Sequence, residues 1–176
     1  MDNQLPKRKN TRLQTFDYNS VGGYFITICT ENRRQILSHV VGADVLDGPP
    51  STIPPNTTVI LSQYGEIANK YLNQLNDHYT DLDIVRYVIM PNHIHIMLVV
   101  KGNGPSRTSA PTKQHSEVSR FVSTFKRFCN KEYGLNIWQR GFHDHIIRDR
   151  TDYEEHLQYI QENPIRWRYD ELYSQE

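Results

Sequence analysis

The residues best suited to chemistry lie in a short histidine-containing segment. Residues 93–100 read HIHIMLVV, so one apolar residue separates His93 from His95. On a β-strand, side chains two residues apart point to the same face and lie about 7 Å apart at the backbone, so two imidazoles can converge on one metal ion. The alternative is a pair of half-exposed polar residues on a sheet face, and this pattern alone does not exclude it.

A second pair with the same spacing follows later in the chain, at His143 and His145, with Asp144 between them. Spacing does not rank the two pairs. The context of the first pair favours it as the ligand pair, because it lies in an apolar strand expected to be central in a sheet. Burying a polar side chain there costs free energy unless the side chain has a specific role. Asp144 and His145 are instead candidates to support the metal ligands from behind.

A phenol and an amide are presented together near the C-terminus. Tyr159 and Asn163 are four residues apart, so on a helix they share one face, while Leu157 and Ile160 point more toward a core. The chain has eleven tyrosines. For any one of them taken alone, a packing role with the hydroxyl in water is the default interpretation.

The elements that position these residues follow from the hydrophobic periodicity. Ser62 is placed to cap a helix, Pro91-Asn92 is a turn between two β-rich runs, and Thr151 opens a capping box at the start of a last helix that Pro164 must end. The periodicity predicts strands over 23–30, 83–90, 93–100 and 142–148, and helices over 61–76, over 117–131 with Gly134 as a stop, and from 151.

This order, βαββαβ followed by a helix, predicts an α+β fold of the ferredoxin-like split βαβ kind. In that fold an antiparallel sheet carries its helices on one face, and here an added C-terminal helix carries the tyrosine. We expect one domain over 1–176, with an exposed proline-rich insertion at 46–58 and a flexible linker at 101–115.

The composition is that of an ordinary globular protein, with 37% hydrophobic and 23% charged residues. The formal net charge of +0 argues against binding nucleic acid through bulk positive charge, but local basic patches remain available to phosphates. Cys29 and Cys129 show no metal-knuckle or disulfide pattern and are expected to be buried thiols. The candidate DNA-binding residues are Lys7, Arg8, Lys9, Arg12, Arg120, Lys126, Arg127, Lys131 and Arg140.

No apolar run reaches the roughly 18 residues that a membrane span needs, and the basic N-terminus lacks the apolar stretch of a secretory signal. We therefore expect no membrane association. The expected location is the cytoplasm, and the family resemblance given below implies a bacterial one, at the nucleoid when the protein is bound to DNA.

Two segments carry a family resemblance. Residues 87–100, YVIMPNHIHIMLVV, and 137–166, IWQRGFHDHIIRDRTDYEEHLQYIQENPIR, resemble the REP-associated and insertion-sequence transposases of the single-tyrosine HUH family. The first contains the Pro-Asn-His-hydrophobic-His motif, and the second contains the Trp-Gln, Asp-His, Ile-Arg, Tyr-Ile and Asn-Pro elements in the family's order. Residues 22–27, GGYFIT, also resemble the family's first strand.

The resemblance implies that His93 and His95 bind the metal and that Tyr159 attacks DNA to form a 5′-phosphotyrosine. It also implies a ferredoxin-like fold and a substrate of single-stranded hairpin DNA, from repetitive palindromic or element-end sequences, bound by a monomer or a homodimer. In related insertion-sequence enzymes the third ligand is a glutamine four residues after the tyrosine. Here that position is Asn163, one methylene shorter, and His143 stands where relatives more often have an aromatic residue.

Two imidazoles, an amide oxygen and water suit Mg²⁺ or Mn²⁺, whereas zinc more often takes cysteine or a closed tetrahedron. Two rivals stay open. A non-catalytic module that binds nucleic-acid hairpins on the same fold would need neither the histidines nor the tyrosine. A metal-dependent hydrolase that uses water would not need Tyr159.

Overall fold

The computed structural model describes residues 21–42, 57–101 and 116–173. The predicted insertion and linker, and the basic residues Lys7, Arg8, Lys9 and Arg12, lie almost entirely outside these ranges. In chain order the elements are β1 (Gly22–Cys29), a 3₁₀ helix (Glu31–Arg33), β2 (Ser38–Val41), β3 (Thr58–Leu61), α1 (Gln63–His78), β4 (Leu82–Ile89), β5 (His93–Val100), α2 (Glu117–Tyr133), β6 (His143–Ile146), α3 (Arg150–Glu162) and a 3₁₀ helix (Trp167–Tyr169).

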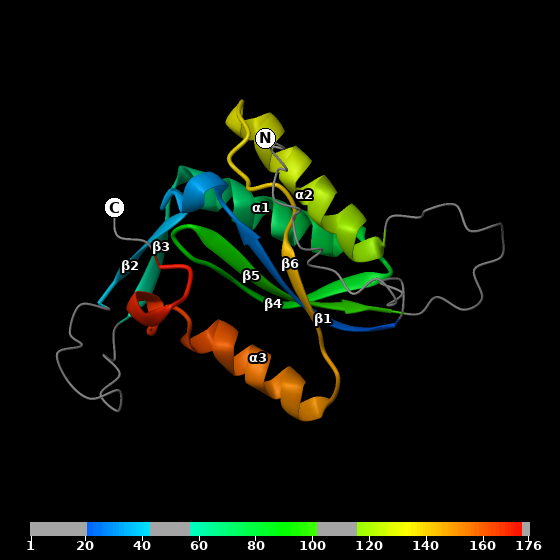
Figure 1. Cartoon of the computed structure of the whole chain (residues 1–176). Coiled ribbons are helices and arrows are strands. Elements are labelled where there is room, and N and C mark those ends of the chain that lie inside the picture. The colour runs from blue at the N-terminus through cyan, green and yellow to red at the C-terminus, as the bar shows by residue number, and fades with distance from the viewer. Residues whose placement is uncertain (1–20, 43–56, 102–115, 174–176) are drawn as a thin grey trace, which may run out of the picture.

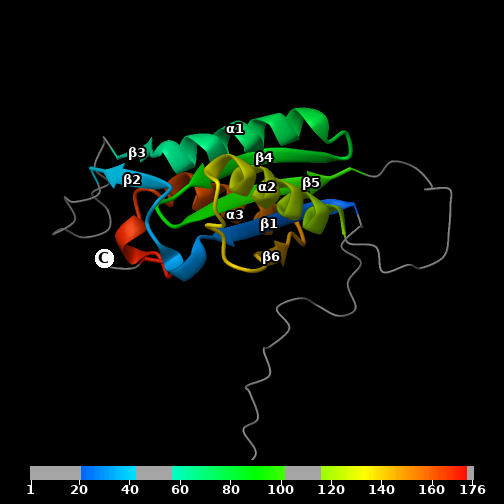
Figure 2. The ribbon, with the colours of Figure 1, turned by 90° about the horizontal axis from the view of Figure 1, so that it is seen from above.

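The main sheet has the strand order β4-β5-β1-β6, and all its neighbouring pairs are antiparallel. This is the order of the ferredoxin-like split βαβ arrangement, so the predicted fold class is confirmed. Helices α1 and α2 cover one face of the sheet, and α3 crosses the opposite face, where it contacts β4 and β5 (Figures 1 and 2). Strand β5 therefore lies between two helical layers.

The core lies between the sheet and the helices α1 and α2. Ile94, Ile96 and Leu98 alternate along β5 into this core, where they pack with Ile26 of β1 and Phe125 of α2. The alternation sends His93, His95 and Met97 to the other face, as predicted. Both sets are buried, because α3 covers the second face and leaves neither side of β5 to solvent.

The stretch between β1 and α1 contains a two-stranded antiparallel sheet, β2 with β3, on either side of the predicted insertion. It is joined tightly to the start of α1. The Ser62 N–H donates to the Leu37 carbonyl at 2.9 Å, and the Ser62 hydroxyl accepts from the Gly65 N–H at 3.2 Å. A Cβ on Gly65 would lie 2.1 Å from the Leu37 carbonyl oxygen, so this close approach requires glycine.

The helix ends agree with the predictions except at the start of α3. Ser62 caps α1, and Gly134 ends α2 in the left-handed conformation with a φ of 73°. The prediction that Thr151 caps the last helix is wrong. Asp149 is the N-cap and accepts from the Asp152 N–H, because an aspartate two residues earlier caps equally well and leaves Thr151 inside the first turn.

Among the described residues, no helix is both long and apolar enough to span a bilayer.

Candidate active site

Strand β5 holds both predicted ligand histidines beneath α3. His93 and His95 have 0% and 3% of their surface exposed, and their ring centroids are 4.3 Å apart. One nitrogen of each ring is already engaged: Nδ1 of His95 hydrogen-bonds Thr27 Oγ1 at 2.8 Å, and Nδ1 of His93 hydrogen-bonds Asn92 Oδ1 at 2.8 Å. These bonds orient both rings and leave Nε2 as the atom available to a ligand.

Burial keeps both imidazoles neutral. It lowers the pKa of His93 to about 3, with the positive charge of Arg33 adding to the effect and the Asn163 side chain opposing it. Burial also lowers the pKa of His95 well below its ordinary value, and His93 contributes in the same direction. A neutral imidazole has a lone pair for a metal at physiological pH, so the electrostatics favour metal binding.

Helix α3 brings Tyr159 and Asn163 to this place. Asn163 is the C-cap of the helix and is 2% exposed, while Tyr159 lies one turn earlier and is 42% exposed. The Tyr159 ring contacts the His95 ring at a centroid distance of 5.2 Å. The predicted pairing of a phenol and an amide on one helical face is present, and both lie beside the histidines.

Asp170 completes the group, and the sequence analysis did not single it out. It follows the last 3₁₀ helix, and its Oδ2 accepts from the Tyr159 hydroxyl at 3.0 Å and from Asn163 Nδ2 at 2.6 Å. Ligand atoms of His93, His95 and Asp170 lie within 4.8 Å of one another. The acidic C-terminal segment was the only sequence signal for Asp170. Spacing could not predict that this carboxylate lies beside β5, about 75 residues earlier in the chain.

The donor atoms around this point fit a cation. Among the described residues, Nε2 of His93, Nε2 of His95 and Oδ1 of Asn163 are buried with no hydrogen-bond partner. Unpaired buried polar atoms are costly, and a bound cation would satisfy the imidazole nitrogens of His93 and His95, whose ligand atoms lie close to each other and to Asp170, and the amide of Asn163, which lies beside His93. The two imidazole nitrogens, the amide oxygen and the neighbouring carboxylate make a mixed nitrogen and oxygen set suited to a divalent metal.

The environment of Tyr159 disfavours its ionised form. Partial burial raises the pKa of the Tyr159 phenol above its usual range, and the negative charge of Asp170 and its hydrogen bond raise that pKa further. A phenolate is the reactive form of a tyrosine nucleophile. Ionisation of Tyr159 therefore requires an added positive charge or a proton acceptor at this place.

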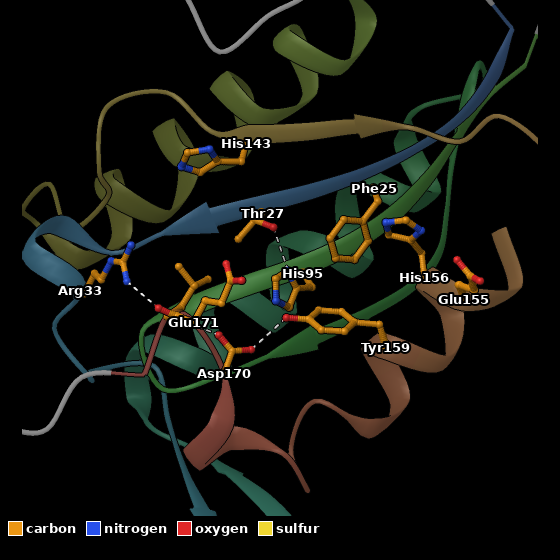
Figure 3. A pocket seen from close by; sticks show the side chains of 11 residues that line it. Phe25, Thr27, Arg33, His95, His143, Glu155, His156, Tyr159, Asp170 and Glu171 are labelled. Carbon is orange, nitrogen blue, oxygen red and sulfur yellow. Dashed lines mark hydrogen bonds between the residues drawn. The ribbon is translucent and has the colours of Figure 1, made fainter. Parts of the chain in front are cut away.

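His95, Tyr159 and Asp170 line a cavity of about 520 Å³ (Figure 3). Arg33 enters it from the 3₁₀ helix after β1 and donates to the Glu171 carbonyl at 3.1 Å. Asn32 and Arg33 both have positive φ, 56° and 54°, a conformation that is costly for residues other than glycine. The lining residues are Phe25, Thr27, Arg33, His95, His143, Glu155, His156, Tyr159, Asp170, Glu171 and Leu172.

Comparison with known proteins was made along the whole chain. No family model matches it. A functionally uncharacterised protein of Haemophilus influenzae is 32% identical over 181 residues, covering 94% of this chain and 93% of the relative. A second H. influenzae protein, provisionally named a REP-associated tyrosine transposase, is 26% identical and covers 89% of this chain and 77% of the relative. The REP-associated tyrosine transposase of Escherichia coli K12 is 24% identical over 82% of this chain and 67% of its own length.

The chain is related to the REP-associated tyrosine transposases. The fold agrees, since a solved structure of a REP-associated tyrosine transposase bound to a REP hairpin superposes with a TM-score of 0.61 at 19% identity. That match covers 90% of this chain and 76% of the other.

The predicted basic residues of α2 lie away from the site. Helix α2 covers the sheet face opposite α3, and the described part of the cavity lining includes Arg33 but none of the predicted DNA-binding residues. Lys126 donates to the carbonyls of Gln139 and Gly141, and burial lowers the pKa of its ammonium to about 8. Arg120 pairs with Glu117, and Arg127 lies over the Phe128 ring. DNA binding by Arg120, Lys126, Arg127, Lys131 and Arg140 stays a prediction.

The second histidine pair is divided between two environments. His143 is exposed at the cavity, while His145 hydrogen-bonds Asp152 through Nε2 at 3.0 Å. Asp144 is one residue out of step with both, so it lies on the opposite face of the sheet. His145 is bonded to Asp152 of α3, and the supporting role of Asp144 and His145 stays a prediction.

Proposed function

We propose that this protein cleaves and rejoins single-stranded hairpin DNA, with Tyr159 as the nucleophile and a divalent metal held by His93, His95 and Asn163. The observation that carries the proposal is that three buried atoms able to bind a metal, Nε2 of His93, Nε2 of His95 and Oδ1 of Asn163, have no hydrogen-bond partner and belong to residues around Tyr159. A non-catalytic binding module has no use for such an arrangement. The names of the transposase relatives support the same reaction class.

Mg²⁺ or Mn²⁺ suits the donor set. The ion, when bound, would neutralise negative charge on the phosphoryl oxygens and stabilise the ionised phenol. His93 and His95 would bind through Nε2, because their Nδ1 atoms are held by Asn92 and Thr27. Asn163 would bind through Oδ1, because its Nδ2 donates to Asp170.

The protein's own groups perform the proton transfer. Tyr159 Oη attacks the phosphorus of a phosphodiester, and its proton passes to the Asp170 carboxylate that it already contacts at 3.0 Å. A bond forms between Oη and phosphorus, and the bond from phosphorus to the 3′ oxygen breaks. The 3′ oxygen leaves with a proton from water, and the 5′ phosphate stays on Tyr159.

Rejoining reverses these steps. A DNA 3′-OH attacks the phosphotyrosine and gives its proton to water, the bond to Tyr159 Oη breaks, and the phenol recovers the proton from Asp170. The phosphodiester energy is kept in the tyrosine ester, so strand transfer needs no nucleotide cofactor. A water-dependent hydrolase would lose that energy and would not need the tyrosine.

The cavity offers groups for an unpaired strand. Arg33 is placed to contact a phosphate, and the exposed ring of Tyr159, beside the partly buried Phe25 ring, is suited to stacking with unpaired bases. Hairpin DNA as the ligand is supported by the related transposase whose solved structure contains a REP hairpin.

The test is cleavage of labelled hairpins taken from DNA flanking the protein's own gene. We expect nicking with Mn²⁺ or Mg²⁺, none with EDTA, and loss of nicking in Tyr159→Phe. Tyr153→Phe, on the same helix one and a half turns earlier, is the matched control and should nick normally. Hairpin binding without nicking under all these conditions would support the binding module instead.

A further inference from the structure

A second group of metal-ligating side chains lies beside the active site. In the described ranges 21–42, 57–101 and 116–173, two sets of three such side chains have ligand atoms within 4.8 Å of one another. One contains the active-site histidines. The other consists of His145 on β6 and of Asp152 and His156 on α3. We propose that His145, Asp152 and His156 form a second metal site, selective for zinc or another late first-row transition metal ion.

The carboxylate of Asp152 lies between the two imidazoles. His145 Nε2 is 3.0 Å from both Oδ1 and Oδ2 of Asp152, and His156 Nδ1 is 3.0 Å from Oδ1. In a tetrahedral zinc site with bonds of about 2.0–2.1 Å, neighbouring ligand atoms are roughly 3.3 Å apart. The distances from Asp152 to the two imidazoles are thus within a few tenths of an ångström of those in a coordinating arrangement, and the ligand atoms of all three side chains lie within 4.8 Å of one another.

The backbone keeps this arrangement in place. Asp152 and His156 are four residues apart on α3, so they share one face of the helix, and His145 reaches them from the neighbouring strand. The rings of His145 and His156 stack at a centroid distance of 4.5 Å and an interplanar angle of 16°. Asp152 Oδ2 also accepts from the Arg148 N–H at 2.9 Å, which fixes the carboxylate.

The site is accessible to ions. The side chains of His145, Asp152 and His156 are 38%, 16% and 22% exposed, so an ion can enter and keep a water as a further ligand. Two imidazole nitrogens and one carboxylate, with a water in the fourth position, match the ligand set of open zinc sites, and cobalt and nickel also accept these ligands. For metal to bind, His156 must give up the hydrogen bond from Nδ1 to the Asp152 carbonyl, which is 2.8 Å long.

A metal ion bound at the second site would link α3, the helix that carries Tyr159, to the sheet. His145 belongs to β6, while the other two ligands belong to the first half of α3, whose second half carries Tyr159. The Phe25 ring lies between the two sites, 4.7 Å from the His156 ring and 5.0 Å from the His95 ring. An ion at the second site therefore restrains the helix without being a ligand of the first site.

Metal stoichiometry tests this proposal without relying on catalysis. The untagged full-length protein is freed of metal and titrated with Co²⁺, with absorption spectra and equilibrium dialysis as readouts. We expect two ions per chain in the wild type and one in His156→Gln or in His145→Gln. His93→Gln is the matched control and should keep the second-site ion and its spectrum, while His93→Gln with His156→Gln should bind none.

Any of three results would overturn the second site. The first is a His156→Gln variant that binds Co²⁺ with the wild-type stoichiometry and spectrum. The second uses only wild-type protein: imidazole NMR signals of His145 and His156 that do not change when Zn²⁺ is added. The third is a His93→Gln variant that binds no Co²⁺, because all binding would then belong to the site that contains His93, which would refute the second site but not the proposed active site.

Discussion

Because His93 is buried and neutral, the metal-free protein should become less stable as the pH falls. The folded state holds the pKa of His93 at about 3, while the unfolded chain takes up a proton below about 6.5. As the pH falls below 6.5 the unfolded state binds more protons, so stability is lost progressively between 6.5 and 3. Above 6.5 this residue contributes no pH dependence.

Each pH unit within that window lowers the free energy of unfolding by about 1.4 kcal/mol, so a fall from about pH 7.5 to about pH 4.5 should lower it by roughly 3 kcal/mol through His93 alone. His95 acts in the same direction, because burial also lowers its pKa. The assay is urea unfolding in EDTA at several pH values, comparing the wild type with His93→Gln.

His93→Gln should lose roughly 3 kcal/mol less than the wild type over this interval, whatever its stability at neutral pH. His39→Gln, at an exposed position on β2, controls for the chemistry of the replacement. Equal losses in the wild type and His93→Gln would refute the claim that His93 is held neutral by burial.

Three further results are expected. Asp170→Asn should lower the pKa of Tyr159 in metal-free protein, because the Asp170 charge and hydrogen bond raise it; ultraviolet difference titration against Tyr159→Phe measures the change. Gly65→Ala should destabilise the fold by about 1–3 kcal/mol or more in thermal or urea unfolding, because the added Cβ meets the Leu37 carbonyl oxygen at 2.1 Å. Ser62→Ala should cost about 1 kcal/mol in the same assay through loss of the α1 cap, and an unchanged midpoint would contradict the capping role.

Local patterns were enough to predict most of the fold and half of the site. Alternation along 93–100 predicts that His93 and His95 share a face, and a four-residue step predicts that Tyr159 and Asn163 share a helical face. Both relations depend on neighbours in sequence. The family resemblance then selected these residues among eight histidines and eleven tyrosines.

Contacts between distant segments could not be predicted in the same way. Asp170 reaches the site because the chain turns back after Pro164, and no periodic pattern describes that turn. Arg33 faces the cavity from a 3₁₀ helix, and its own φ is positive. Positive φ is usually predicted from a glycine, and this position has none. The basic residues near 120–140 indicated DNA binding at α2. Which face of the sheet carries the candidate site depends on where α3 packs, and the sequence pattern does not determine that packing (Figure 2).

The most direct test of the proposed reaction is the identity of the residue joined to DNA. Hairpin DNA is incubated with the protein and Mn²⁺, the covalent complex is digested with protease and nuclease, and the modified peptide is sequenced by mass spectrometry. The proposed mechanism predicts a nucleotide phosphate on Tyr159 and on no other tyrosine, and its absence when EDTA is present. Cleaved DNA with no modified peptide, or a phosphate on another residue, would contradict it.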